Sequence, residues 1–230
     1  NELGAACEAG VSGRDLDRVA RKRLESGGGK WPFVGKKLPD WPPFPCVITV
    51  SPNEAIVHGI PTTHPFKKGD ILSLDVGATL NGFIGDTAGT FTVGEISPAA
   101  QRLLRVTREA LDKGIEAAVV GNYVGDISYA IQTHVETHGY SIVRELIGHG
   151  VGRSMHEDPP VPNYGKRGEG AKLRPGMTIA IEPMVNEGAA AVKTLADKWT
   201  VVTKDGSLSA HFEHTVAILS DGPEILTIDE

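Results

Sequence analysis

Residues 72–91, LSLDVGATLNGFIGDTAGTF, are typical of two β-strands joined by a tight turn. Asn-Gly between apolar runs is the strongest short-range signal for a two-residue type I′ hairpin, because both turn residues need positive φ angles. With Asn81 and Gly82 in the turn, Leu80 lies opposite Phe83, and the strands pair outward from there. The sequence therefore predicts an antiparallel hairpin of defined register.

Each strand of this hairpin carries one aspartate in an apolar setting, Asp75 and Asp86. The register puts Gly77 opposite Asp86. Asp75 is two residues from Gly77, so both carboxylates project from one face of the sheet, one diagonal step apart. Diagonal neighbours lie roughly 7–8 Å apart, and two unpaired anions so close repel each other. The pair therefore indicates a site for cations.

The overall composition narrows the class of protein. The chain has 230 residues and a net charge of −6, so nucleic acid and anionic membranes are poor candidate partners. No apolar run approaches the roughly 20 residues of a membrane span, and no secretory leader opens the sequence. The two cysteines, Cys7 and Cys46, form no CxxC motif, which favours a reducing compartment. We expect a single cytoplasmic catalytic domain over residues 1–230.

Three helices are predicted from periodicity and caps. One begins near Ser12, where Asp15 completes a capping pair, and a second follows Ser97 and a proline at its first turn. A third begins at Asp126 and stops before a glycine. These helices are expected to cover one face of a sheet.

The remaining chain favours short strands and loops. Residues 26–45 are rich in Gly and Pro and predict a long surface loop that carries aromatic side chains. Short β-type runs are found at residues 46–51, 141–146, 177–185, 198–204 and 210–219. The pattern predicts a one-domain α+β fold in which hairpins carry the chemistry.

Three further candidate ligands follow downstream. His149 lies between two glycines, which let the backbone and a ligand approach closely. Glu182 ends an apolar run before a proline, and Glu213 lies within another β-type run. Each of these residues alone is more often structural or solvated. It is the set of five, with Asp75 and Asp86, that points to a metal centre.

Four carboxylates and one imidazole form an oxygen-rich donor set suited to two divalent ions, whereas a structural zinc site favours cysteine. The four negative charges roughly balance two such cations. Carboxylates can bridge a pair of ions about 3.5–4 Å apart, and a water shared by the pair ionises near neutral pH. The sequence therefore predicts metal-assisted hydrolysis of an amide bond.

Five segments carry a resemblance to a known family: NEAIVHGIP, LDVGATLNGFIGDTAGTF, GHGVGRSMHEDP, IEPMV and SLSAHFEHTVAI. In this order, from about Val11 to Leu219, they resemble the motifs of the methionine aminopeptidases, which remove the initiator methionine from new proteins. The resemblance implies the pita-bread fold, two pseudo-symmetric halves around a central antiparallel sheet. No long insertion separates His149 from Glu182, so the chain is more similar to type I than to type II of the family.

The resemblance also implies a role for each candidate residue. It makes ligands of Asp75, Asp86, His149, Glu182 and Glu213 to two divalent ions, which are Co, Mn, Fe or Zn. Asp86 and Glu213 would bridge the ions, and Glu182 would pass a proton to the departing amine after hydroxide attack on the first peptide bond. His58 and His156 would hydrogen-bond the scissile peptide and the developing oxyanion.

The pocket for the methionine side chain is expected to be apolar. By resemblance it is lined by Phe44, Trp199, Trp41, Thr49 and Met155. Asn53 and Ser209 match positions around a monovalent-cation site. The expected substrates are peptides and nascent chains with N-terminal methionine and a small second residue, and the ribosome is a further candidate partner. The leading helix of the family is expected to be incomplete at the N-terminus.

Alternatives remain open. One is a dinuclear peptidase that cuts before proline, although such enzymes usually carry a sizeable extra N-terminal domain. Another is a non-catalytic module with the same fold, although such modules generally lose ligands.

The HVETH segment places His134 and His138 at i, i+4 on a helix, where they could hold zinc. Because they share the helix stripe of Ile127 and Ile131, we interpret them as histidines that pack between helices.

Overall fold

The computed structural model describes residues 2–37, 39 and 41–228, and its main feature is a large antiparallel sheet. The strands of this 8-stranded sheet run in the order β1-β3-β4-β13-β8-β6-β7, and β14 pairs with β13. Their bounds are β1 Thr49–Pro52, β3 Ile71–Leu80, β4 Phe83–Thr92, β6 Gly148–Gly150, β7 Glu157–Val161, β8 Thr178–Ile181, β13 Glu213–Leu219 and β14 Gly222–Ile225.

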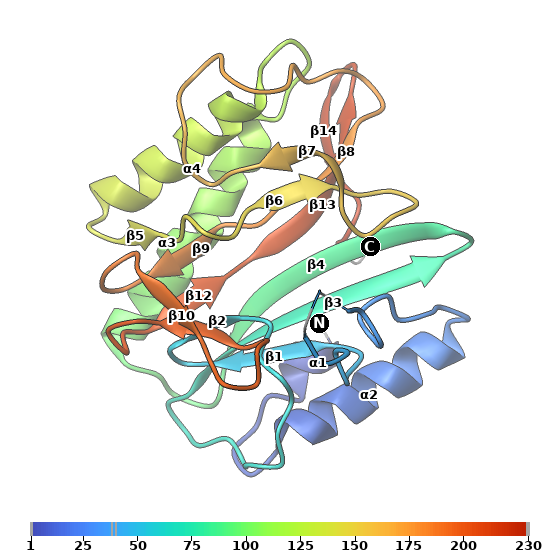
Figure 1. Ribbon diagram of the computed structural model, residues 1–230. Helices are drawn as coiled ribbons and strands as arrows, with labels where there is room; N and C mark the ends of the chain where they lie inside the picture. The colour runs from blue at the N-terminus through green and yellow to red at the C-terminus, as the bar shows by residue number, and fades with distance from the viewer. Residues whose placement is uncertain (1, 38, 40, 229–230) are drawn as a thin grey trace.

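Two three-stranded sheets flank the large one, in the orders β10-β11-β2 and β12-β9-β5. Their strands are β2 Ala55–Val57, β5 Ser141–Ile142, β9 Met184–Asn186, β10 Val192–Thr194, β11 Val201–Thr203 and β12 Ser209–His211. The helices are α1 Glu2–Ala5, α2 Gly13–Ser26, α3 Pro98–Ala117 and α4 Val124–Thr137. Figure 1 shows α3 and α4 side by side and α2 near β1 and β3.

The predicted hairpin is present in the predicted register. Leu80 pairs with Phe83 and Gly77 with Asp86 along β3 and β4. Asn81 and Gly82 adopt φ angles of 52° and 80°, as a type I′ turn requires. Local turn chemistry has therefore set the pairing of both strands.

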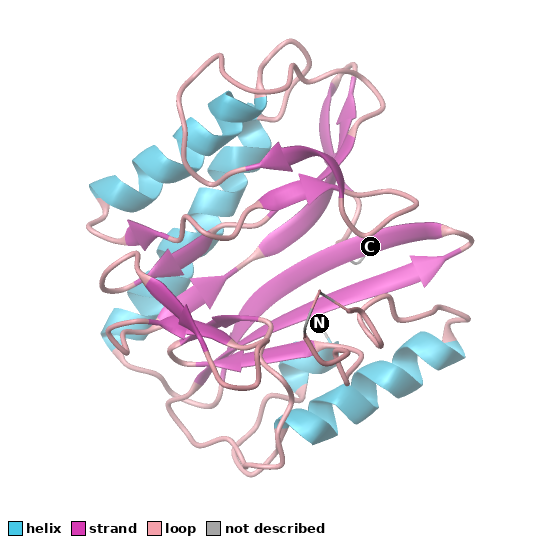
Figure 2. Cartoon of the chain, viewed as in Figure 1, coloured by secondary structure: helices cyan, strands magenta, loops and turns pink. Residues whose placement is uncertain are grey.

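The helices cover the face of the sheet that points away from Asp75. Leu74 neighbours Asp75 on β3 and so points to the other face, where it packs in one buried cluster with Leu16 of α2. Ile181 of β8 and Val216 of β13 pack in a second cluster with α3 and α4. Figure 2 shows the helices gathered outside the strands. One face of the sheet is thus left for the site, and the predicted α+β architecture is confirmed.

The helix caps are confirmed, with small shifts. The Ser12 side chain accepts from the backbone N–H of Asp15, and the Asp15 side chain accepts from Ser12 in return, which caps α2. Ser97 caps α3. The third helix begins at Val124 rather than at Asp126, because the Asp126 carboxylate accepts from the backbone of Tyr123 and caps an earlier turn.

Two predicted β-type runs and one predicted loop differ from the structure. The run 177–185 contains two strands in different sheets, because β8 pairs with β6 and β13 whereas β9 pairs with β5 and β12. The run 210–219 is not one strand, because the chain changes sheets at Phe212: β12 pairs with β9, whereas β13 pairs with β4 and β8. The loop at 26–45 is not confined to the surface, because Phe33 and Phe44 are buried. Leu38 and Asp40 lie outside the described residues. Among the described helices, none is long and apolar enough to cross a membrane.

Candidate metal centre and pocket

Strand register brings the acidic residues of the hairpin and of β13 onto one face. Ala88 of β4 pairs with Asp75 on one side and with Glu213 on the other. Residues directly opposite in antiparallel strands project to the same face, so the small Ala88 lies between two carboxylates. Asp86 is two residues from Ala88 and shares the face. Three of the five candidate ligands therefore meet across β3, β4 and β13.

Strand pairing also brings the other two candidate ligands, His149 and Glu182, to this face. Ala180 of β8 pairs with Thr215 on β13 and with His149 on β6. Glu182 is two residues from Ala180, directly after β8, and Glu213 is two residues from Thr215. The period of two along each strand thus points His149, Glu182 and Glu213 to the face that carries Asp86.

The side chains converge closely. The His149 Nε2 atom lies 3.8 Å from Asp86 Oδ2 and 3.6 Å from Glu182 Oε1. Asp86, His149 and Glu213 each offer one ligand atom within 4.8 Å of the others. Asp75 lines the same cavity. The structure therefore brings all five predicted ligands to one place.

Backbone contacts hold two of these ligands in orientation. Thr215 Oγ1 accepts from the Asp86 N–H (2.9 Å) and donates to the Asp86 carbonyl (2.8 Å), which fixes β4 against β13. His149 Nδ1–H donates to the Gly150 carbonyl at 2.8 Å. This bond sets the tautomer and leaves the lone pair of Nε2 facing the acids, as in metal-ligating histidines.

Burial disfavours the ionised form of the four carboxylates when no cation lies near them. Desolvation raises the pKa of Asp75 to about 7. It also raises the pKa values of Asp86 and Glu213 well above the usual range, with neighbouring acids as further causes. The pKa of Glu182 rises for the same reasons. A site with this charge is stable in its ionised form only when cations compensate it.

The donor set fits divalent ions. The buried oxygens Asp75 Oδ1 and Asp86 Oδ1 have no hydrogen-bond partner among the described residues, and buried polar atoms are normally paired. Carboxylate oxygens with one imidazole are ligands that Mn, Fe, Co and Zn accept. The arrangement can therefore hold metal and expose it to the cavity.

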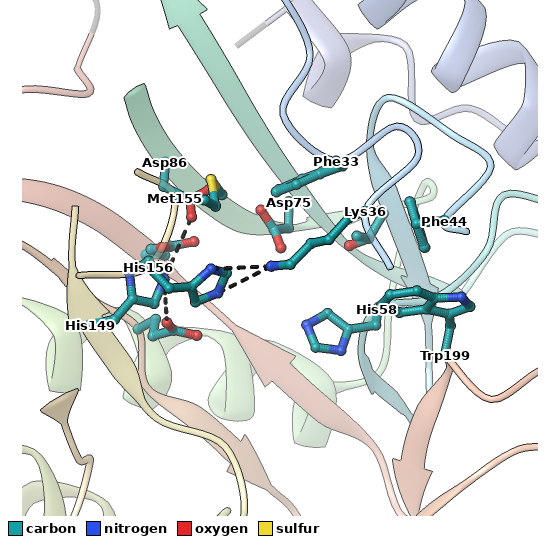
Figure 3. A pocket seen from close by; sticks show the side chains of 13 residues that line it. Phe33, Lys36, Phe44, His58, Asp75, Asp86, His149, Met155, His156 and Trp199 are labelled. Carbon is teal, nitrogen blue, oxygen red and sulfur yellow. Dashed lines mark hydrogen bonds and ion pairs between the residues drawn. The ribbon is translucent and has the colours of Figure 1, made fainter. Parts of the chain in front are cut away.

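Lys36 is a site residue that the sequence did not reveal. Its Nζ atom lies 3.1 Å from Nδ1 of His156, and Figure 3 shows the side chain reaching across the pocket beside Asp75. Burial lowers the pKa of Lys36, while Asp86, Asp75 and Glu182 act in the opposite direction. The predicted surface loop at 26–45 thus delivers a cation to the metal centre.

Two histidines predicted to contact the substrate, His58 and His156, lie beside the candidate metal ligands. His156 lies against His149, with ring centroids 4.2 Å apart, and burial, followed by the His149 charge, lowers its pKa to about 3. His58 has a positive φ of 58°, rare for a residue with a side chain. Burial lowers the pKa of His58 to about 4, with Lys36 as a further cause. Both rings are therefore neutral near pH 7 and each can donate one N–H.

His211 is a further residue that sequence reasoning left out. It is buried, and its Nε2 atom lies 3.7 Å from Glu182 Oε2. Burial lowers its pKa to about 3, so the ring beside the Glu182 carboxylate is neutral near pH 7. The available signal was its parity with Glu213, two residues along the same run.

An apolar wall completes the cavity, whose volume is ≈ 310 Å³. Trp199 lies edge-to-face against Phe44 at 5.3 Å between ring centroids and donates from Nε1 to the Pro42 carbonyl at 2.8 Å. Trp41 packs on Trp199 at 5.2 Å but does not line the cavity. The cavity is lined beside the polar groups by Phe33, Phe44, Thr49, Met155 and Trp199. Phe33, like Lys36, is a lining residue that the sequence analysis missed.

Asn53 and Ser209 lie next to each other, because the Ser209 N–H donates to the Asn53 carbonyl at 3.0 Å. The Asn53 amide bonds Asp70, and the Ser209 hydroxyl bonds Asn186. Their side chains are therefore occupied by internal hydrogen bonds, and the monovalent-cation site stays a prediction.

The chain is similar to known metallopeptidases. Metallopeptidase family M24 matches residues 1–220. The chain belongs to this family. Among M24 relatives, the methionine aminopeptidase of Clostridium acetobutylicum is 52% identical over 231 residues, which cover 100% of this chain and 90% of the relative. The crystal structure of methionine aminopeptidase from Rickettsia prowazekii matches with a TM-score of 0.95 at 39% identity and covers 98% of this chain and 90% of that one. The pita-bread fold is confirmed.

A more distant likeness concerns the fold alone. The prolidase of Pyrococcus horikoshii matches with a TM-score of 0.75 at 22% identity. The match covers 96% of this chain and only 55% of the prolidase. The M24 fold is thus shared with a chain of much greater length.

Proposed function

We propose that the chain is a metal-dependent aminopeptidase that removes N-terminal methionine from peptides with a small second residue. One observation carries this proposal: the five candidate metal ligands line the same small cavity as the apolar side chains of Phe33, Phe44, Met155 and Trp199. Similarity to methionine aminopeptidases over the full chain supports it.

The pocket suits a methionine side chain. A thioether gains from burial and from contact with aromatic rings, typically about 0.3–1.5 kcal/mol for each sulfur–aromatic pair. Phe44 and Trp199 offer ring edges and faces, and Met155 offers an adaptable apolar surface. Peptides that begin with methionine are therefore expected to place the first carbonyl beside the acids.

The proposed centre holds two divalent ions, which are Mn, Fe, Co or Zn. The ions would be held by Asp75, Asp86, His149, Glu182 and Glu213. Such ions lower the pKa of a water toward neutrality and polarise a carbonyl.

The chain's own groups handle the protons and the charge of the reaction. Glu182, backed by His211 at 3.7 Å, would accept a proton at its carboxylate and release it to the departing amine. The neutral rings of His58 and His156 would donate N–H groups to the scissile peptide and to the developing oxyanion. Each such donor typically contributes about 2.7–4 kcal/mol.

Further parts of the proposal rest on resemblance or on composition. They are a monovalent cation beside Asn53 and Ser209, a single catalytic domain over residues 1–230, a cytoplasmic location, and nascent chains on ribosomes as substrates. Likeness to type I of the family belongs with them.

The test is hydrolysis of Met-Ala-Ser by protein that has been chelated and then reloaded with cobalt or manganese. We expect metal-dependent release of methionine and no cleavage of an Xaa-Pro peptide. Glu213→Ala is expected to abolish both metal binding and turnover, whereas Glu224→Ala, an exposed acid on β14, leaves both unchanged. Preferred cleavage of the Xaa-Pro peptide would favour the proline-directed alternative. Failure of the chain to bind divalent ions would favour a non-catalytic module.

A further inference from the structure

A second group of metal-type ligands lies between α3 and α4. Glu109 of α3, His134 of α4 and His138, which directly follows α4, each offer one ligand atom within 4.8 Å of the others. This is the same geometric relation that joins Asp86, His149 and Glu213. The two groups are separate, because α3 and α4 cover the face of the sheet opposite the metal centre. Figure 1 shows these helices beyond the strands.

The helix spacing aims both imidazoles at one place. Residues four apart share a helix face, and the rings of His134 and His138 have centroids 4.5 Å apart at an interplanar angle of 43°. The pair lies between the helices, as the sequence analysis predicts, but not in the core. The side chains of His134 and Glu109 are 17% and 37% exposed, so an ion from solvent can reach them.

Hydrogen bonding prepares His138 for a ligand. Its Nδ1–H donates to the His134 carbonyl at 2.7 Å, which fixes the tautomer and leaves a lone pair on Nε2. This arrangement, with one ring nitrogen anchored on a backbone carbonyl, is typical of histidines that bind metal. Arg102 donates to the His138 carbonyl at 2.9 Å and steadies the end of α4.

Glu109 and His134 already have nearly the spacing of two ligands on one ion. His134 Nε2 and Glu109 Oε2 are 3.1 Å apart, and two ligands at about 2.0–2.2 Å on a tetrahedral zinc lie roughly 3.4 Å apart. Arg105 contacts the other oxygen, Oε1, at 3.6 Å, so Oε2 remains for a metal. An ordinary hydrogen bond between helices explains His134 and Glu109, and the bond to the His134 carbonyl explains Nδ1 of His138. Neither bond requires that ligand atoms of all three residues lie within 4.8 Å of one another.

We propose that Glu109, His134 and His138 form a second metal site that binds a zinc-class divalent ion and ties α3 to α4. Two imidazoles and one carboxylate are a common zinc donor set that leaves a fourth position to water. Binding would replace the proton between His134 and Glu109 with the ion. Because it holds two helices together, the ion should stabilise the fold without taking part in peptide cleavage.

The experiment counts bound zinc. Metal-free protein is mixed with ZnCl₂ at micromolar concentration, dialysed, and analysed for zinc per chain. We expect the double variant His134→Gln/His138→Gln to bind one zinc fewer than the unmodified chain. The matched control, His64→Gln, removes an exposed histidine outside both groups and should bind as many ions as the unmodified chain.

Two further readouts separate this site from the catalytic one. Manganese-supported release of methionine should be equal in the double variant and the unmodified chain, while the zinc-dependent rise in Tm should be smaller in the variant. Crystals with zinc should give an anomalous peak beside Glu109. Equal zinc counts in both proteins, or a third-ligand variant Glu109→Gln that binds zinc as tightly as the unmodified chain, would overturn the proposal.

Discussion

The ammonium group of Lys36 places a positive charge inside a centre built to hold metal cations. Its charge interacts with Asp86, Asp75 and Glu182, so it competes electrostatically with any ion bound there. Opposite and like charges a few ångströms apart at a partly buried site interact by about 1–4 kcal/mol. Lys36 is therefore expected to weaken metal binding.

Lys36→Met tests this effect. We expect the Kd for manganese to fall by roughly tenfold, which corresponds to about 1.4 kcal/mol, as measured by isothermal titration calorimetry. Lys37→Met removes an exposed neighbouring charge and serves as the control, with little change. Equal or weaker manganese binding by the Lys36 variant would show that the ammonium group does not oppose the metal.

His156→Ala tests the proposed donor. We expect kcat for Met-Ala-Ser to fall by about 10²–10³, the typical loss when one oxyanion donor is removed. The metal content should stay unchanged, because His156 is not among the five ligands. Steady-state kinetics with metal analysis of the same sample checks both. Full activity in this variant would refute the role assigned to His156.

At the scale of elements, the β3–β4 hairpin positions the two aspartates. Substitutions in its turn test this role directly. Gly82 has a φ of 80°, and an added Cβ would meet no atom closer than Arg153 Nη1 at 3.7 Å. Different side chains at position 82 are therefore expected to change the free energy of unfolding only through backbone strain.

Gly82→Val is expected to lower the free energy of unfolding by about 1–3 kcal/mol, since a β-branched residue tolerates positive φ poorly. Gly82→Asn, which tolerates this region, should lose clearly less. Urea denaturation of both variants gives the comparison. Equal losses in the two variants would mean that the turn conformation does not govern the stability of the hairpin.

Some features of these elements were predictable from the sequence and others were not. The register of β3 and β4 was predictable because Asn81 and Gly82 determine it locally. The break at Phe212 was not, because a continuous β-type run looks the same whether its residues stay in one sheet or change sheets. Phe33 and Lys36 were missed for a related reason: a loop rich in Gly and Pro has no periodicity that would show which side chains turn inward.

At the scale of the whole molecule, the layering determines where the chemistry lies. Helices bury one face of the large sheet, and side chains from the loop at residues 26–45 help to enclose the cavity on the other face, so four carboxylates are buried together. The five ligands come from five separate segments, and only their shared strand parity unites them. From the sequence this parity was usable only for Asp75 and Asp86, because Asn81 and Gly82 determine the register of their strands. His149, Glu182 and Glu213 were predicted from their sequence surroundings and from the resemblance, since the pairing of their strands could not be derived from local sequence.

Burial of these acids makes the stability of the metal-free protein depend on pH. Above about pH 7 the histidines, whose pKa values are lowered by burial, are neutral in both folded and unfolded chains. The acids with raised pKa values, such as Asp75 at about 7, hold more protons when folded than when unfolded. The free energy of unfolding must then fall as pH rises toward the folded-state pKa of each acid, and each acid's share of the loss is complete above that pKa.

We therefore expect the Tm of the chelated protein to decrease between about pH 7 and 8.5, and manganese to remove most of this decrease by compensating the ionised acids. Thermal denaturation with and without manganese measures both. A metal-free Tm that rises over this interval would contradict the raised pKa values.

The most direct test of the whole account is anomalous diffraction from crystals of the protein grown with manganese. The account predicts two manganese peaks surrounded by Asp75, Asp86, His149, Glu182 and Glu213. A map with no manganese among these side chains, and the carboxylates turned apart, would contradict it.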